Sequence, residues 1–256
     1  SDGYLANGTE PWRLPDLDDL PTIDPDFATS TNHTDTDGNE VFWPYVRDPE
    51  TLARPWAPPG TPGLEHRIGG LEKEDGSGNV AYDGANHERM TRLRAAKIAG
   101  IAHDIPPTDV DDPEGDADVL VVGWGSTYGA IAAGVRRVRA RGYKVAHAHL
   151  VHLNPFPADL GQVLGRYRKV LVPEVNLGQL SRLLRAEYLV DAVSFTQVQG
   201  IPFKAAAMEA AILQQIEGVA ETVDGDGGHS ATVHAGTGNG KSAGQAAAPA
   251  TGKVSD

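Results

Sequence analysis

The stretch that predicts the fold is Val119-Leu120-Val121-Val122-Gly123-Trp124-Gly125-Ser126-Thr127. Its first four residues are all apolar, which is typical of a parallel strand that is covered on both faces. The glycine-containing residues that follow predict a tight turn into a helix over residues 127–141, and Gly142 is placed to end that helix. Such a strand–turn–helix unit is characteristic of an α/β domain.

The same alternation continues to residue 217. We expect strands at residues 144–151, 170–172 and 192–197, and helices at residues 157–167, 178–188 and 203–216. Strands that are separated by helices pair in parallel through right-handed crossovers. The predicted fold class is therefore α/β, with a small parallel sheet flanked by helices over residues 117–217.

The flanking segments differ in composition from this domain. Residues 11–105 are rich in proline and aspartate but also carry aromatic side chains, which predicts an irregular, ordered wrap followed by a helix from Asn86, as N-cap, to Gly100. Residues 106–116 hold three prolines and several acids and predict a solvated acidic linker. Residues 218–256 are dominated by small and polar residues and predict a disordered tail.

Composition excludes several classes of function. The 256 residues contain 35 acids and 22 bases, a net charge of −13, which argues against nucleic acid as a partner. The chain has no cysteine, so it cannot itself form a disulfide, a thiolate zinc site or a cysteine-held iron–sulfur cluster. No apolar run approaches the roughly 20 residues that span a bilayer, so we expect no membrane partner and a cytoplasmic location.

Three groups of residues are candidates for chemistry. Residues 123–129 could cradle an anion at a helix N-terminus, but the third glycine is one place late for a dinucleotide motif, which favours a tight packing turn. His147 and His149 share one face of an expected strand; with no third ligand nearby, they are interpreted as partly buried and no metal is assigned. Glu65, His66 and Arg67, followed by two glycines, could bind a carboxylate or a phosphate, but no other residues supply the second half of such a site, which favours a structural loop.

Several stretches together resemble the α subunit of bacterial 2-oxoacid:ferredoxin oxidoreductase, of the 2-oxoglutarate type. They occur in the order Ser1 to Gly8, Pro62 to Gly70, Asn86 to Gly100, Val122 to Ser126, Leu153 to Pro157 and Pro173 to Gln179. The resemblance covers about residues 1–217. Each motif is weak alone, whereas the set in this order is specific.

The resemblance implies an activity for a complex. Members of the family use thiamine diphosphate with Mg to decarboxylate a 2-oxoacid, here 2-oxoglutarate, with pyruvate in the same substrate class. Electrons pass through an iron–sulfur cluster to ferredoxin, and the acyl group passes to coenzyme A. The β subunit would be the partner in a heterodimer and would hold the cluster.

The resemblance also assigns parts of the chain. Residues 1–10 correspond to the end of a truncated pyrimidine-binding domain, and residues 117–217 to a transketolase C-terminal-like domain. No catalytic residue is expected in this chain, which alone would bind none of these cofactors and be inactive. Glu65, His66 and Arg67 are candidates for substrate or coenzyme A contact. Glu174, Asn176 and Gln179 are candidates for a domain interface.

A second hypothesis remains open at this point. The α/β domain could belong to a self-standing ligand-binding or interaction module without catalysis.

Overall fold

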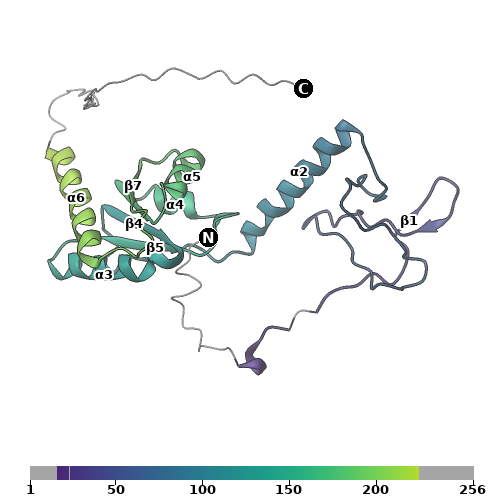
Figure 1. Cartoon of the computed structure of the whole chain (residues 1–256), viewed down its shortest axis with the longest axis horizontal. Helices are drawn as coiled ribbons and strands as arrows, with labels where there is room; N and C mark the ends of the chain where they lie inside the picture. The colour runs from purple at the N-terminus through teal and green to yellow at the C-terminus, as the bar shows by residue number, and fades with distance from the viewer. Residues whose placement is uncertain (1–15, 23, 225–256) are drawn as a thin grey trace, which may run out of the picture.

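The computed structural model describes residues 16–22 and 24–224, with side chains described up to residue 219. The lobe at the left of Figure 1 is built on a five-stranded sheet of order β3-β5-β4-β6-β7. The strands are β3 (Val110–Asp111), β4 (Val119–Trp124), β5 (Ala146–Leu150), β6 (Lys169–Glu174) and β7 (Ala192–Thr196). The last four pair in parallel, and β3 pairs antiparallel with β5 at the edge.

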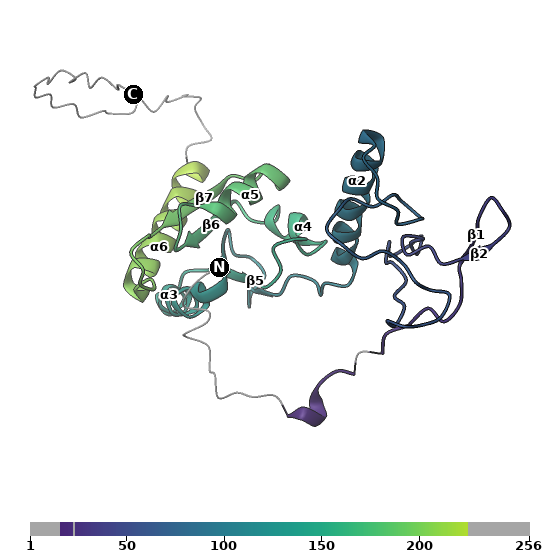
Figure 2. The ribbon, with the colours of Figure 1, turned by 45° about the vertical axis from the view of Figure 1, so that its right-hand side comes forward.

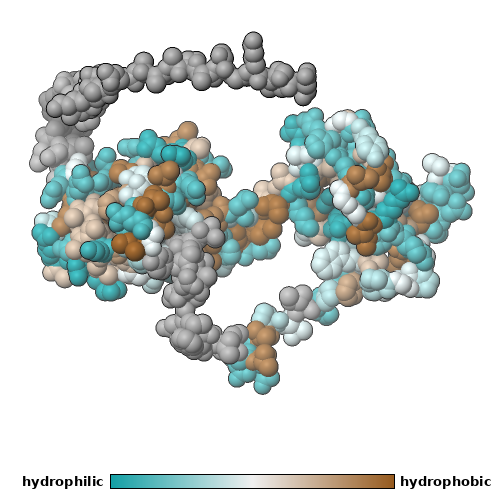
Figure 3. All heavy atoms as spheres, in the orientation of Figure 1, coloured by the Kyte–Doolittle hydropathy of each residue, from teal (hydrophilic) through white to brown (hydrophobic). Residues whose placement is uncertain are grey.

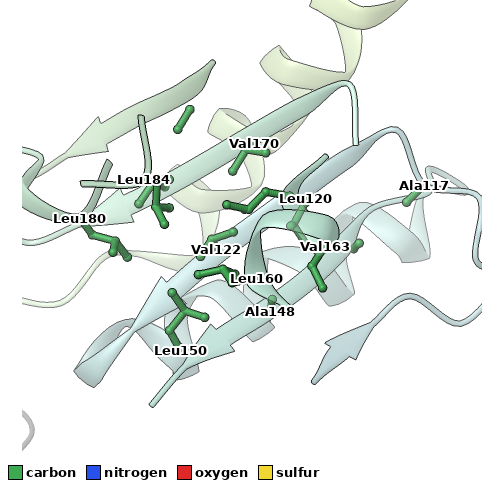
Figure 4. Close-up of a cluster of buried hydrophobic side chains, with 14 residues drawn as sticks. Ala117, Leu120, Val122, Ala148, Leu150, Leu160, Val163, Val170, Leu180 and Leu184 are labelled. Carbon is green, nitrogen blue, oxygen red and sulfur yellow. The ribbon is translucent and has the colours of Figure 1, made fainter. Parts of the chain in front are cut away.

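Two pairs of helices cover the two faces of this sheet, as Figure 2 shows. The helices are α3 (Tyr128–Ala140) with α6 (Ala205–Asp224) on one face, and α4 (Leu160–Leu164) with α5 (Gln179–Tyr188) on the other. Residues 119–123 are buried at every position, because alternate side chains of β4 enter two different cores. Figure 4 shows the core under α4 and α5, where Leu120 and Val122 meet Leu160 and Leu180. The predicted α/β class is confirmed.

The other lobe, at the right of Figure 1, is mostly irregular. It holds a two-stranded hairpin of β1 (His33–Thr34) and β2 (Glu40–Val41) and isolated bridges such as Tyr45 with Gly76. A short 3-10 turn (Leu17–Asp19) precedes the hairpin in the chain and lies below the lobe in Figure 1. The helix that follows, α2 (Gly84–Gly100), leads towards the sheet, where the next 3-10 turn spans Ile101–His103. Figure 3 shows hydrophobic residues in the segment that joins the two lobes.

The start of α2 differs from the prediction. Asp83 is its N-cap, and the Asp83 carboxylate accepts a hydrogen bond from the Asn86 backbone N–H. The Asn86 side chain instead donates to the Lys73 carbonyl and the Glu72 carboxylate. An acid can therefore cap three residues earlier while the amide ties the helix to the preceding loop.

Residues 106–116 do not form a free linker. Val110 and Asp111 are the edge strand β3, and Thr108 donates from its backbone N–H and its hydroxyl to Asp159. Arg139 bonds Asp111, and the Lys144 ammonium bonds two further acids of the segment, Glu114 and Asp116. The acids repel one another less than the sequence suggests, because bases of the domain neutralise them.

The last helix is longer than predicted. α6 continues to Asp224, so residues 218–224, assigned to the tail from sequence, are helical. Val219 is only 5% exposed and packs into the core with α3, which offsets the propensity cost of about 1 kcal/mol for Gly218. The remaining tail from residue 225, and the segment 1–10, lie outside the described residues.

Candidate functional site

The carboxyl ends of β4 and β6 mark the point where ligands bind in many open α/β sheets. The chain passes from β4 to β5 on one side, and β6 then lies on the other side of β4. The connections therefore reverse direction between β4 and β6, which creates a crevice at their carboxyl ends. The residues that follow these strands are the turn 123–127 and the turn 174–179.

Glu174 is the centre of the polar network at this edge. Its side chain is fully buried, at 0% exposure. The carboxylate accepts hydrogen bonds from the backbone N–H groups of Leu180, at 2.7 Å, and Ser181, at 3.1 Å, both in the first turn of α5. It also accepts from the Asn176 amide at 3.1 Å and from the Trp124 indole N–H at 3.4 Å. One buried carboxylate thus connects β6, the first turn of α5 and the turn after β4.

Asn176 shapes the turn between β6 and α5. Its side-chain oxygen accepts from the backbone N–H groups of Gly178, at 2.8 Å, and Gln179, at 2.9 Å. Gly178 has a φ of +81°, and a Cβ there would lie 2.8 Å from the Ser194 hydroxyl, so the turn requires glycine. Asn176 is half-buried, while Gln179 is exposed and Leu177 is 71% exposed at the tip.

This arrangement limits the chemistry available at the edge. The first-turn amides of α5, which attract anions at a helix N-terminus, already have the Glu174 carboxylate as their acceptor. An external phosphate has no comparable place there. What the turn offers outward is a rigid surface carrying Leu177 and Gln179, which suits contact with another protein surface.

The turn after β4 is a packing turn, as predicted. A Cβ on Gly123 would come within 2.4 Å of the Ile131 side chain, so α3 can approach the strand only because this residue is glycine. The Thr127 hydroxyl accepts from the Trp124 N–H and donates to the Trp124 carbonyl. Close packing thus accounts for Gly123, whereas a Cβ on Gly129 would meet nothing within 4 Å.

His147 and His149 lie side by side on β5, facing α3. His147 is 5% exposed, His149 is half-buried, and both rings lie against Tyr128, with centroids 5.6 and 5.1 Å away. His149 Nε2 bonds the Gly125 carbonyl at 3.1 Å. Among the described residues, His147 Nε2 and His149 Nδ1 are buried and have no hydrogen-bond partner. Both are strand histidines, as predicted, but only His149 is partly buried, whereas His147 is fully buried.

The buried histidine pair predicts a pH-dependent stability. Burial, and then the neighbouring His149, lower the pKa of His147 from 6.5 to about 4. Between these two pH values the unfolded chain takes up a proton that the folded chain does not, so stability falls as the pH falls from 6.5 to 4. We expect a loss of about 2 kcal/mol from this residue between these pH values. Urea titrations of wild type and His147→Gln at both pH values measure it.

The exposed His103 provides the matched control. His103→Gln should keep the wild-type pH dependence, whereas His147→Gln should lose the part due to His147. If the free energy of unfolding changed equally with pH in wild type and both variants, the burial of His147 would not be the cause of the pH dependence.

The structure does not bring Glu65, His66 and Arg67 near the sheet edge. They lie in the irregular lobe, where Glu65 and Arg67 are exposed and His66 is half-buried. His66 Nδ1 lies 2.8 Å from the Leu64 carbonyl, and the ring packs edge-on against Phe42. His66 therefore anchors the loop, while Glu65 and Arg67 point charged groups into solvent, available to an external group.

A groove between the lobes was missed from sequence. It has a volume of about 1050 Å³ and lies between α2, through residues such as Arg94 and Ile98, and the segment Leu153–Pro157. Leu183 and Tyr188 of α5 complete its wall. The sequence does not indicate this groove, because its two sides, α2 and the segment Leu153–Pro157, are more than fifty residues apart in the chain.

No group of three or more His, Asp or Glu side chains that could hold a metal occurs among residues 16–22 and 24–224. Within the same residues, no helix has both the length and the apolar composition needed to cross a bilayer.

The comparison with protein families matches the sheet domain. Residues 117–200 match the family model of pyruvate:ferredoxin oxidoreductase core domain II. The match falls within the sheet domain and includes the turns at both strand ends described above.

The longer matches extend this assignment to most of the chain. The chain is 58% identical over 205 residues to the 2-oxoglutarate oxidoreductase subunit KorA of Mycobacterium tuberculosis, covering 80% of this chain and 30% of that protein. It is 31% identical over 115 residues to the 2-oxoglutarate synthase subunit KorA of Methanocaldococcus jannaschii, covering 45% and 30%. The chain is thus similar to one part of these 2-oxoglutarate oxidoreductase subunits.

A solved structure agrees with the sequence matches. The 2-oxoglutarate:ferredoxin oxidoreductase from Magnetococcus marinus, solved with 2-oxoglutarate, coenzyme A and succinyl-CoA bound, superposes with a TM-score of 0.67 at 32% identity. The superposition covers 79% of this chain and 34% of that one. The chain therefore spans about a third of the length of the proteins it matches.

Proposed function

We propose that this chain works as part of the α subunit of a 2-oxoacid:ferredoxin oxidoreductase. This enzyme would convert a 2-oxoacid to its acyl-coenzyme A, and 2-oxoglutarate is the proposed substrate. The observation that carries the proposal is the 58% identity with the Mycobacterium tuberculosis subunit across four fifths of this chain. The β subunit of the enzyme would be its partner, ferredoxin its electron acceptor, and the cytoplasm its location.

The cofactors of such an enzyme do not fit the described residues. Thiamine diphosphate with Mg needs metal ligands and diphosphate-binding amides, but the described residues contain no metal-ligating cluster. The first-turn amides of α5 are already bonded by Glu174. A cysteine-held cluster is impossible in a chain without cysteine. We therefore assign no reaction step to this chain, and place the cofactors elsewhere in the complex.

We therefore propose two roles for this chain: to form a domain interface and to contact a small molecule. We propose that the turn from Glu174 to Gln179 forms a domain interface, in which Glu174 and Asn176 hold the backbone and Leu177 and Gln179 make the contact. We also propose that the loop of Glu65, His66 and Arg67 contacts substrate or coenzyme A, since a guanidinium can bind a carboxylate or a phosphate through two hydrogen bonds.

The purified chain alone is expected to bind no thiamine diphosphate and to show no turnover of a 2-oxoacid with coenzyme A and a viologen acceptor. The reason is the absence of a fitting site in the described residues and of cysteine in the whole chain. Titration calorimetry with thiamine diphosphate and Mg measures the binding. Tight binding by the isolated chain would contradict the proposed division of roles.

A further inference from the structure

Two arginines lie over one tyrosine ring in the irregular lobe. The guanidinium carbon of Arg54 is 4.5 Å from the centroid of the Tyr45 ring, and that of Arg47 is 5.7 Å away. Both side chains are half-buried. Two cations so close to one ring repel each other, and the ring itself compensates only part of their charge.

Neither arginine forms an ion pair within the part of the chain that the structure describes. Arg47 donates from Nη1 to the Leu52 carbonyl at 3.1 Å, while its Nε is buried and has no hydrogen-bond partner there. The lobe as a whole is nevertheless acidic, because residues 16–83 contain fifteen acids and only four bases. Two of the four bases of this acidic lobe therefore meet at Tyr45, and no carboxylate of the described residues lies within ion-pair distance of either, although Asp75 acts on Arg47 electrostatically.

A cleft of about 410 Å³ adjoins this cluster. Its lining includes Tyr45, Arg47 and Arg89, with apolar walls from Leu52 and Leu93. Arginine and aromatic side chains beside apolar walls are typical of sites for small anionic molecules, and the volume lies in the range of such sites.

The two acids that line the cleft are already engaged. The Asp75 carboxylate bonds Arg89, and the Asp48 carboxylate accepts from the Thr51 hydroxyl and from the backbone N–H groups of Glu50 and Thr51. These turn bonds lower the pKa of Asp48, so it stays ionised and bound to its own turn. Among the described residues neither acid forms an ion pair with Arg47 or Arg54, although the charge of Asp75 acts on Arg47 from a distance.

We propose that Arg47 and Arg54 bind an oxyanion, the phosphate or carboxylate group of a small molecule whose apolar part occupies the cleft beside Tyr45. Guanidinium groups are suited to both anions because their N–H groups match two oxygen atoms at once. The guanidinium N–H groups of Arg54, and those of Arg47 other than the buried Nε and the bond to Leu52, would supply the donors. This site is independent of the function proposed for the whole enzyme, because it concerns binding by this chain alone.

Calorimetric titration of the 256-residue chain with pyrophosphate and, separately, with glutarate tests the proposal and distinguishes the two anions. We expect one of them to bind, and Arg54→Gln to weaken that binding at least about tenfold. Arg54 is the cleaner target because, unlike Arg47, it makes no hydrogen bond to the backbone. Arg92→Gln is the matched control, since Arg92 is an exposed arginine of α2 that pairs with Glu88 away from the cleft.

Three outcomes would overturn the proposal: binding of neither anion, equal binding by wild type and Arg54→Gln, or equal weakening by Arg92→Gln. A circular dichroism spectrum and melting curve for each variant show that the comparison is between folded proteins. Because the readout is binding and not turnover, a negative result would leave the assignment to an oxidoreductase subunit unaffected.

Discussion

Glu174→Ala is expected to lower the free energy of unfolding by about 3–5 kcal/mol. The side chain is fully buried and accepts from four donors, two of them the Leu180 and Ser181 backbone N–H groups. Removing it leaves these donors without an acceptor in a place that water does not reach. A buried donor without a partner costs about 1–3 kcal/mol, and a cavity is left in addition.

Glu174→Gln separates hydrogen bonding from volume. The amide keeps the size of the side chain and one acceptor oxygen, but its NH₂ group then faces a donor that the carboxylate had satisfied. We expect a smaller but clear loss of about 2–3 kcal/mol. Urea unfolding followed by circular dichroism measures both variants.

Glu187→Gln is the control, because Glu187 is an exposed acid on the same helix, α5. It should change stability by less than about 0.5 kcal/mol. If Glu174→Gln were as stable as Glu187→Gln, the buried network would not hold α5 to the sheet in the way described.

Much of the sheet domain could be predicted from sequence because its signals are local. The apolar run of β4 needs only its own residues to indicate a strand covered on both faces. Helix lengths were less predictable. The helix expected over residues 157–167 shrinks to Leu160–Leu164, because Pro157 precedes it and Gly165 follows its last turn.

The edge strand β3 illustrates what sequence cannot give. Val110 pairs with Ala148, thirty-eight residues later, and nothing in an acidic, proline-rich segment announces that partner. Asp111 of β3 is neutralised by Arg139 in the last turn of α3, and the following acids Glu114 and Asp116 by Lys144, which comes after that helix. Local composition therefore predicted a solvated linker where tertiary contacts form a strand.

The polar sites show the same limit. The Pro173-Glu174 end of a strand followed by Asn176 and Gly178 indicates a turn, but not that the carboxylate turns inward to the helix it precedes. An acid six residues before a first-turn amide is the signal that could have suggested it. Arg47 and Arg54 meet over Tyr45 through an irregular fold, for which no sequence periodicity exists.

The central claim is that this chain is a working part of a 2-oxoacid:ferredoxin oxidoreductase α subunit, and exchange of homologous parts tests it most directly. The matched part of the Mycobacterium tuberculosis KorA subunit would be replaced by the 205 residues of this chain that align with it. The exchanged subunit would be produced with the other components of that enzyme. Size-exclusion chromatography establishes assembly before turnover is measured.

Two variants of the exchanged subunit sharpen the comparison. Glu174→Ala should prevent stable assembly, because α5 and its turn would no longer be held in place. Arg67→Ala should assemble normally and raise KM for 2-oxoglutarate or coenzyme A if its loop contacts either one.

The deciding measurement is 2-oxoglutarate-dependent, coenzyme A-dependent reduction of a viologen by the assembled exchanged enzyme. At 58% identity over the exchanged part, we predict a rate within about tenfold of the unmodified enzyme, which corresponds to a barrier change of about 1.4 kcal/mol or less. An exchanged enzyme that assembles with the same size and cofactor content but shows no turnover would contradict the assignment. It would favour the alternative of a self-standing binding or interaction module.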